Sequence, residues 1–325
     1  MDGDSFIPSI FKVKRGFMMS NKNIRDQIIN NTRNKSNIFE RMIPVILLLI
    51  TSVSILATIG ILVTLLSESF EFFSRVPITE FLTSATWQPY VGDGEWGIWA
   101  LIMGTLKIVA IAVIFAVPIG LGAAIYLSEY ASDRVRRIIK PILEVLAGIP
   151  TVVYGFFAIN FVNPILQGIY SGFGLYNAVS AGIVVGIMII PMIASLSEDA
   201  MSSVPTAMRE GSLGMGATRL ETAIRVVIPA AFSGIVASFV LAISRAIGET
   251  MIVSIAAGSM PNASFDVTEP LQTMTGFIVQ ITSGDAAFGT DLYYSLFAVG
   301  MMLFIMTLLM NVIASWFTKR FKEEY

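Results

Sequence analysis

The chain of 325 residues has 55% hydrophobic and only 14% charged residues, whereas a typical soluble domain has about 25% charged residues. It has no histidine and no cysteine, which excludes histidine acid–base chemistry, disulfides and Cys/His metal sites, and its net charge of −2 gives no reason to expect nucleic-acid binding. With a mean hydropathy of +0.75, too few polar side chains remain to cover a soluble surface, so we expect an integral membrane protein surrounded by lipid.

Six segments are apolar over about 20 residues or more, the length that crosses a bilayer core of about 30 Å. We therefore predict an all-α protein with six transmembrane helices, at residues 42–66, 97–127, 138–166, 176–196, 230–258 and 292–317. The basic segment 1–41 is not predicted as a cleavable signal, because its apolar run begins only after about 40 residues. Two interpretations of it stay open, a short interfacial helix and a disordered tail.

The Lys and Arg residues alternate from one side of the predicted helices to the other. Residues 1–41 hold eight, the five connections in order hold one, four, none, three and none, and the C-terminal tail holds three. Because Lys and Arg accumulate in cytoplasmic loops, this series predicts that both termini lie in the cytoplasm. An even number of spans agrees with that orientation.

The cytoplasmic connection from about residue 205 to 229 has the most informative pattern. It predicts a short helix over Pro205–Leu213, a turn at Gly214 and Gly216, and then a second helix. Gly216 supplies the positive φ or the close approach that a tight reversal needs, and Pro229 suits the first turn of the fifth span. The second helix is predicted to be amphipathic, with three apolar side chains on one face: Leu220, Ile224 and Val227.

This connection resembles the coupling loop of ABC importer permeases, whose pattern is Glu-Ala-Ala, three residues, Gly, nine residues and Ile-x-Leu-Pro. Glu210 takes the place of the Glu, Gly216 falls six residues later, and Pro229 closes the pattern. Gly211 and Ser212 replace the two alanines and are also small. The resemblance implies that the loop inserts into a groove on a separate ATPase subunit; the alternative is a helix-turn-helix that matches by chance.

Two further segments are similar to the PstC family of phosphate permease subunits, at residues 143–155 (Leu-Glu-Val-Leu-Ala-Gly-Ile-Pro-Thr-Val-Val-Tyr-Gly) and 244–253 (Ser-Arg-Ala-Ile-Gly-Glu-Thr-Met-Ile-Val). The resemblance extends from about Trp96 to the end of the sixth span. It implies that residues 42–325 form one six-helix domain with the type I ABC importer permease fold, in the cell membrane. It also implies three partners that handle phosphate together with this chain: a PstA-like second permease subunit, a PstB-like ATPase dimer and a PstS-like external phosphate-binding protein.

The chain shows no nucleotide-binding signature of its own. No Gly-Lys dipeptide occurs, so there is no Walker A loop to hold nucleotide phosphates. We therefore expect no enzymatic activity and no cofactor in this chain, with ATP hydrolysed by a separate subunit.

Apart from Lys140, which is counted with the second connection, four charged residues are predicted inside spans: Lys107, Glu144, Arg245 and Glu249. A charge at a helix centre costs about 2.5–3.5 kcal/mol on insertion scales, so such residues usually pair and have a function. The resemblance assigns Arg245 and Glu249 to the phosphate path. Lys107 is added because helical rise puts it at a similar depth, and Glu249 is expected to pair with Arg245 or Lys107. The alternatives are a structural ion cluster for these three and, for Glu144, a first-turn carboxylate favoured by the helix dipole.

Small and proline residues inside the spans indicate packing and bending. Gly182 and Gly186 have the spacing of a close helix–helix contact. Pro118, Pro150 and Pro191 are expected to kink the second, third and fourth spans, where freed backbone can line a cavity.

Three other functions fit parts of this pattern. A permease for another oxyanion, such as sulfate or molybdate, would share the coupling loop. An ion-coupled secondary transporter or channel would act without ATP and without partner subunits. A membrane scaffold protein would leave solute uptake unchanged when deleted.

Overall fold

The computed structural model describes residues 37–92 and 94–320, so most of the basic segment 1–41, with its two interpretations, lies outside the described residues. The chain divides into two units inside helix α2 (Asn37–Arg75), between Thr64 and Leu65, and each unit is described by itself. From Met42 to Thr64 nearly every side chain is exposed and apolar. An apolar helix without a polar face needs lipid or another protein around it, which agrees with the first predicted span.

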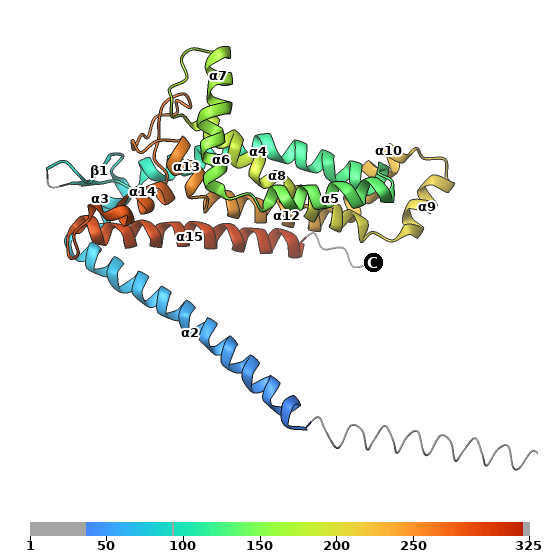
Figure 1. The fold of residues 1–325 in the computed structure, drawn as a ribbon, viewed down its shortest axis with the longest axis horizontal. Helices are drawn as coiled ribbons and strands as arrows, with labels where there is room; N and C mark the ends of the chain where they lie inside the picture. Colours follow the sequence, from blue (N-terminus) through green and yellow to red (C-terminus); the bar gives the residue numbers. More distant parts are fainter. Residues whose placement is uncertain (1–36, 93, 321–325) are drawn as a thin grey trace, which may run out of the picture. The chain divides into compact units, whose positions relative to one another are not determined.

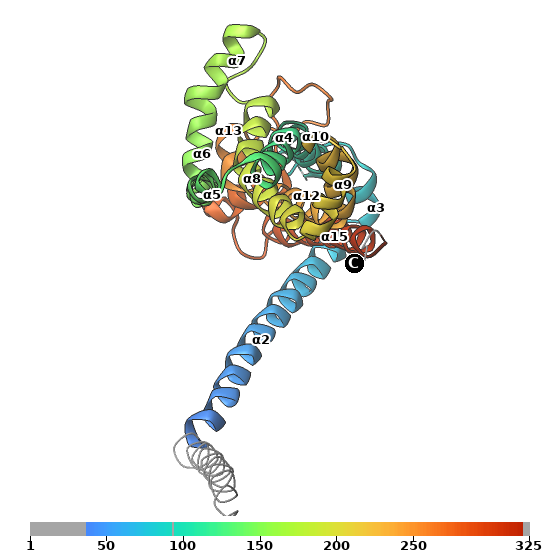
Figure 2. The ribbon, with the colours of Figure 1, turned by 90° about the vertical axis from the view of Figure 1, so that its right-hand side faces the viewer.

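The second unit is a bundle built on four long helices: α4 (Trp99–Ile125), α8 (Ala178–Ser202), α12 (Phe232–Ile247) and α15 (Asp291–Arg320). A π-helical turn, η1 (Tyr126–Tyr130), continues α4. Helix α8 packs against both α4 and α12, and α12 packs against α15 (Figures 1 and 2). The core between them is aliphatic, because these side chains have no polar atoms to satisfy at membrane depth.

The close approach of α4 and α8 depends on glycines in α8. A Cβ added at Gly182 would lie 2.7 Å from Cβ of Ile111, and one added at Gly186 would lie 3.0 Å from the carbonyl oxygen of Ala112. The predicted contact at these two glycines is therefore confirmed. Pro118 and Pro191 lie inside α4 and α8, which both continue through them.

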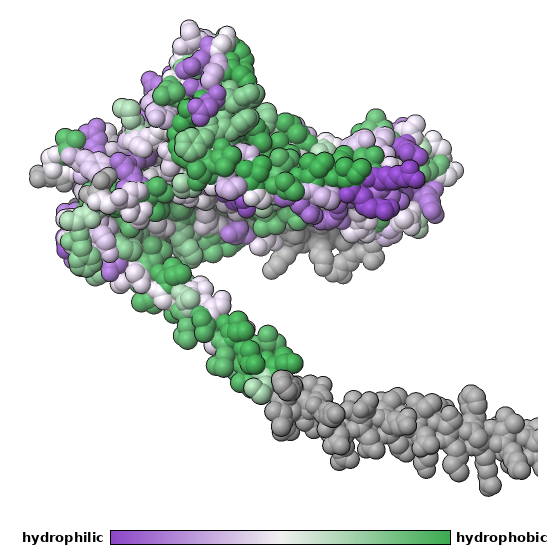
Figure 3. All heavy atoms as spheres, viewed as in Figure 1, coloured by the Kyte–Doolittle hydropathy of each residue, from purple (hydrophilic) through white to green (hydrophobic). Residues whose placement is uncertain are grey.

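The third predicted span is wrong as one continuous helix. Residues 138–147 belong to α5 (Asp133–Ala147), and the chain breaks at Gly148–Pro150 before α6 (Thr151–Phe157), η2 (Ala158–Val162) and α7 (Asn163–Ile169). The break follows from the sequence, because a residue before proline avoids the α conformation. Helices α6 and α7 run across the direction of the bundle in Figure 1. Figure 3 shows apolar side chains over α6 and hydrophilic ones over the start of α5.

The fifth predicted span is also interrupted. A short helical stretch, Arg219–Ala230, meets α12 at a bend of 73°, and α12 itself ends before a second short helix, α13 (Met251–Ala256). In the described residues, five helices are long and apolar enough to cross a membrane, and this bent pair makes a sixth if it counts as one span. Each of the six predicted segments thus corresponds to one of these candidates.

An aromatic cluster closes the end of the bundle opposite the 205–229 loop (Figure 1). It joins the end of α2 to α3 (Ile78–Thr83), to a two-stranded antiparallel sheet of β1 (Trp87–Gln88) and β2 (Glu95–Trp96), and to α14 (Met274–Gln280), which is followed by η4 (Ile281–Asp285). The rings pack edge to face, an arrangement that aromatic quadrupoles favour: Phe72, Phe81, Trp87, Trp96 and Phe277.

Candidate functional site

The 205–229 loop is a helix, a reversal and a second helix, as the sequence predicts. Helix α9 (Thr206–Gly214) begins after Pro205 and is followed by Gly216 at φ +90°. A Cβ at Gly216 would meet nothing within 4 Å, so glycine is required here by its backbone angle and not by lack of space. Gly214 is the last helical residue, and the reversal therefore belongs to Gly216.

The second helix of the loop begins with a capping box that the sequence analysis missed. The Thr218 hydroxyl accepts from the Glu221 N–H (3.3 Å), and the Glu221 carboxylate accepts from the Thr218 N–H (2.9 Å). The Glu221 carboxylate also accepts from the Thr218 hydroxyl (3.0 Å), and the two bonds that the carboxylate accepts, the backbone one first, lower the pKa of Glu221. The signal was present as Thr218-Arg-Leu-Glu221, the Ser/Thr-x-x-Glu pattern of a helix start.

The helix that follows does not place its three predicted apolar side chains on one face. It runs through α10 (Arg219–Thr222), a π-helical turn η3 (Ala223–Val227) and α11 (Ile228–Ala230), whose first turn contains Pro229. Leu220 and Ile224 are more than half exposed, but Val227 is buried. The wider π turn changes the angle between successive side chains, which separates Val227 from the other two.

Several side chains of the loop are free to meet a partner. Glu210 and Gly211 are exposed, and Met215 is 90% exposed. Ser212 is tied to the second helix by a hydrogen bond of 2.9 Å between its hydroxyl and that of Thr222. A pocket of about 310 Å³ opens beside this bond, lined by Ser212, Met215, Gly216, Ala217, Glu221 and Arg225. Exposed apolar groups on a fixed helix-turn-helix suit insertion into a groove of another protein.

Arg209 anchors the loop to the bundle and was also missed from the sequence. Its guanidinium donates to the carbonyls of Met201 (2.6 Å) and Val204 (2.5 Å) at the end of α8, and to the carboxylate of Glu129 in η1 (3.3 Å). The neighbouring Glu210 points outward while Arg209 points inward. No local sequence pattern distinguishes these two orientations, because the inward one depends on where α8 ends and on Glu129, which is 80 residues away.

The three predicted path residues lie on α4, near the end of α12 and just after it, and the structure does not bring their charges together. Helix α12 ends at Ile247, so Arg245 and Glu249 do not share a continuous helix. The Glu249 side chain is buried, and its carboxylate accepts from the backbone N–H groups of Met251 (3.0 Å) and Ile252 (3.2 Å) at the start of α13. Lys107 lies on α4, where its ammonium is 3.5 Å from the carbonyl oxygen of Asp266.

Arg245 has an exposed side chain near the end of α12. Among the side chains that the structure describes, no ion pair includes Arg245 or Glu249. The sequence analysis placed Arg245 and Glu249 on one continuous helix, which is wrong, because Gly248 and the capping carboxylate of Glu249 interrupt the helix between them.

Buried polar groups surround the break at Glu249. Thr273 caps α14 by accepting from the Gly276 N–H (3.0 Å), and the Thr105 hydroxyl accepts from the Met274 N–H (3.1 Å). The Thr275 hydroxyl donates to the backbone carbonyl of Glu249. Irregular backbone is tolerated at membrane depth only where protein or a water-filled cavity surrounds it. The start of α13 and the start of α14 therefore form one polar region inside the bundle.

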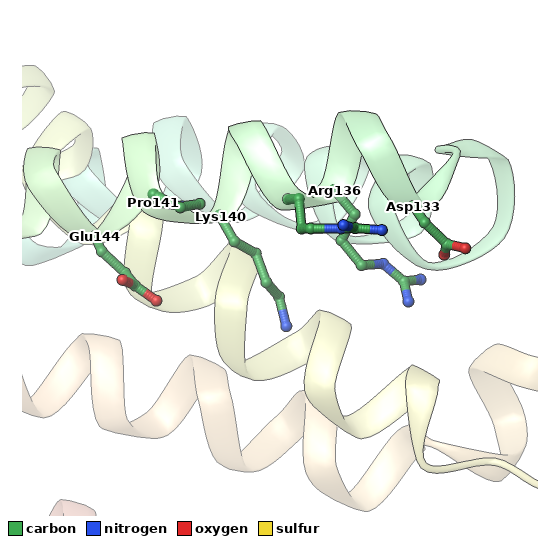
Figure 4. A pocket seen from close by; sticks show the side chains of 6 residues that line it. Asp133, Arg136, Lys140, Pro141 and Glu144 are labelled. Atoms are coloured by element: carbon green, nitrogen blue, oxygen red, sulfur yellow. The ribbon is translucent and has the colours of Figure 1, made fainter.

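A second charged group lies where α5 contacts α8. Glu198 is only 1% exposed and pairs with Lys140 and, at 3.4 Å, with Arg136; Lys140 also pairs with Asp199 at 2.8 Å. Figure 4 shows the α5 side of this cluster, at a pocket of about 410 Å³ lined by Asp133, Arg136, Arg137, Lys140, Pro141 and Glu144. The sequence analysis ended the fourth span at Leu196, before Glu198, and so missed this buried acid.

Comparisons with known proteins agree with the fold. Residues 116–323 match the family described as "Binding-protein-dependent transport system inner membrane component". The chain is 31% identical over 309 residues to "Probable ABC transporter permease protein YqgH" of Bacillus subtilis (strain 168), covering 93% of this chain and 98% of that protein. It is 34% identical over 282 residues to "Phosphate transport system permease protein PstC" of Mesorhizobium japonicum, covering 80% and 84%.

Solved structures share the fold at low sequence identity. A chain of a bacterial alginate ABC transporter has a TM-score of 0.65 at 16% identity, covering 90% of this chain and 99% of that one. A chain of the MetNI methionine ABC transporter has a TM-score of 0.54 at 18% identity, covering 70% and 98%.

The apolar helices, the family match and the named relatives define a multi-pass membrane transport subunit. The chain belongs to the family of binding-protein-dependent ABC importer permeases, the inner membrane components of these systems, and it is located in the cell membrane. The resemblance inferred from the sequence is confirmed, including the likeness to PstC proteins.

Proposed function

We propose that this chain is the permease subunit of an ATP-driven phosphate importer. The observation that carries the proposal is the coupling loop, with its reversal at Gly216 and its exposed Met215, in a chain that is 34% and 32% identical to two proteins named PstC. Importing an anion into a cell that is negative inside costs about 2.3 kcal/mol per charge per 100 mV. A divalent oxyanion therefore needs an energy source, which a passive channel does not supply.

The likeness to PstC proteins implies three partners, and exposed surfaces of this chain support two of them. A PstB-like ATPase dimer would receive the loop through Met215, Leu220 and Ile224, with Glu210 at the rim, and would hydrolyse the ATP. A PstA-like second permease subunit would cover apolar side chains that this chain leaves exposed, such as Val145 and Phe156. A PstS-like phosphate-binding protein would deliver phosphate on the opposite side of the membrane.

Arg245, Glu249 and Lys107 are proposed as the phosphate path. The planar guanidinium of Arg245 offers paired donors to phosphate oxygens. Its exposure in this chain supports a role toward a second subunit or a water-filled path, because a charge facing lipid at a helix centre costs about 2.5–3.5 kcal/mol. Glu249 would fix the backbone conformation at the break that follows α12, next to Arg245. Lys107, whose ammonium lies beside the loop that contains Asp266, would attract the anion.

The test is uptake into vesicles that contain the reconstituted complex of both permeases and the ATPase, with the binding protein outside. The expected result is phosphate uptake that requires ATP and the binding protein, with no sulfate or molybdate uptake. Sulfate or molybdate uptake without phosphate uptake would assign the chain to another oxyanion. Uptake by this chain alone, without ATP, would assign it to secondary transport.

A further inference from the structure

One inward-facing side chain ties the coupling loop to the bundle. Arg209 is on α9, one residue before Glu210, yet its side chain is only 18% exposed and Glu129, its acidic partner, is 9% exposed. The Arg209 Nη1 and Nη2 groups bind the carbonyls of Val204, just after the end of α8, and of Met201, in its last turn. The Met201 carbonyl also accepts from the Val204 N–H at 3.2 Å. Charge-assisted hydrogen bonds of this kind are about twice as strong as neutral ones.

The same network continues beyond Arg209. The Ser128 hydroxyl donates to the Glu129 carboxylate at 2.8 Å, and the Arg136 guanidinium donates to the carbonyls of Leu127 (2.8 Å) and Ser128 (3.2 Å). Arg136 then pairs with the buried Glu198 of α8. Polar contacts therefore connect α9, η1, α8 and α5 at one end of the bundle.

Apolar packing alone does not fix α9. The cluster beneath the loop consists of Ala124, Met201, Val204, Val227, Ala231 and Ile235, and the only α9 side chain packed against it is Met208, which is partly buried. No residue of α9 is itself buried. The hydrogen bonds of Arg209 therefore provide most of the directional attachment of α9 to α8 and to the end of α4.

We propose that Arg209, held by Glu129, is the positioning residue that makes α9 move as one body with the ends of α4 and α8. A displacement of α9 by the ATPase would then reach the membrane helices instead of being absorbed by bending at Pro205 and Gly216. This inference rests on the proposed function, because it assumes that the ATPase acts on this loop. Arg209 would act through other residues and would not contact phosphate.

The test uses the complete reconstituted transporter with Arg209→Gln, Glu129→Gln and the double variant. Arg134→Gln is the matched control, since Arg134 is an exposed residue of α5 outside this network. Three quantities are measured: ATPase subunit retained on purification, ATP hydrolysed, and phosphate imported per ATP. A merely structural role would lower all of these together.

With Arg209→Gln we expect the ATPase to stay bound and hydrolysis to continue, while phosphate imported per ATP falls by about tenfold or more, because two to three charge-assisted hydrogen bonds are lost. Glu129→Gln should cause a smaller fall, since the two carbonyl bonds remain. The double variant should be no worse than Arg209→Gln alone. Arg134→Gln should match the wild type.

Because the native chain has no cysteine, a thiol pair provides a second test. The Glu129→Cys and Arg209→Cys double substitution should uncouple hydrolysis from uptake, and a short bifunctional thiol reagent should restore phosphate imported per ATP. The proposal is overturned if Arg209→Gln leaves phosphate imported per ATP unchanged, or if the cross-link fails to restore coupling. It is also overturned if Arg209→Gln loses the ATPase from the complex, or if Arg209→Gln and Arg209→Lys, which keeps the positive charge, both prevent assembly. A wild-type complex without ATP-driven uptake would instead overturn the proposed function.

Discussion

The Thr275 hydroxyl donates a hydrogen bond of 2.7 Å to the backbone carbonyl of Glu249. This bond joins α14 to the break between α12 and α13. The helix has ended at Ile247, so this carbonyl has no partner in a continuing helix, and both residues are more than 90% buried. The side chain of Thr275 thus replaces a backbone hydrogen bond at the point where the predicted substrate path leaves regular structure.

Thr275→Val is expected to destabilise the assembled transporter by about 1–3 kcal/mol, because it keeps the side-chain shape but leaves a buried carbonyl without a donor. The measurement is the thermal unfolding midpoint of the purified complex in detergent. Thr275→Ser keeps the hydroxyl and should retain most of the stability. A wild-type midpoint for the Val variant together with a lowered midpoint for the Ser variant would show that the methyl group, and not the hydrogen bond, stabilises this region.

Gly216→Val should uncouple ATP hydrolysis from uptake without preventing membrane insertion. A φ of +90° is disfavoured for a residue with a Cβ by about 1–2 kcal/mol, and more for a β-branched residue, so the reversal should shift. The matched control is Gly214→Ala, because Gly214 is helical and an added Cβ meets nothing within 4 Å. Wild-type phosphate uptake with Gly216→Val would mean that this loop is not the ATPase-docking element.

The capping box should make the start of α10 sensitive to acid. Hydrogen bonds from the Thr218 N–H and hydroxyl lower the pKa of Glu221 in the folded state below its unfolded value. The stabilisation is therefore fully present above the unfolded pKa and is lost as the pH falls through the folded pKa. Amide hydrogen exchange at residues 218–222 should show protection that is retained from neutral pH down to about pH 4.3, the unfolded pKa of a glutamate, and that declines below it.

Glu221→Gln is the control for this titration, since an amide can still accept a hydrogen bond but does not ionise in this range. We expect weaker protection at neutral pH in the variant, with little change as the pH falls. Identical pH profiles for the two proteins would assign the acid response to another group.

The sequence predicts where the six spans lie, though not the interruptions of the third and fifth, because each span rests on a local property, about 20 apolar residues in a row. The break at Gly148–Pro150 was also readable, but the apolar residues from Ile138 onward concealed that α5 is a separate helix. Glu198 could not be predicted as a buried ion, because its burial depends on Arg136 and Lys140, about 60 residues earlier in the chain.

The 205–229 loop also has one feature that the sequence predicts and one that it does not. Its reversal at Gly216 was predicted because glycine has a distinct backbone preference. The inward orientation of Arg209 depends on the end of α8 and on Glu129 in η1, so only the folded structure shows it. Local chemistry is thus readable from the sequence, whereas charge partners far apart in the chain are not.

The proposed phosphate path is tested most directly by Arg245→Gln in complexes whose assembly has been verified. If the Arg245 guanidinium binds phosphate oxygens, its removal should lower phosphate uptake by about tenfold or more, since one hydrogen bond to a charged group contributes about 1.5–3 kcal/mol. Arg245→Lys keeps the charge but not the planar paired donors, so uptake should be intermediate.

Lys107→Gln separates the path from a structural ion cluster. Lys107 is close to the carbonyl of Asp266, so a structural role predicts a lower unfolding midpoint with unchanged phosphate affinity. A role in the path predicts the reverse, a raised phosphate concentration for half-maximal uptake with an unchanged unfolding midpoint, because an attracting charge is lost.

Uptake that persists in Arg245→Gln with unchanged rate and unchanged selectivity against sulfate would make Arg245 structural and would place the phosphate path elsewhere in the bundle.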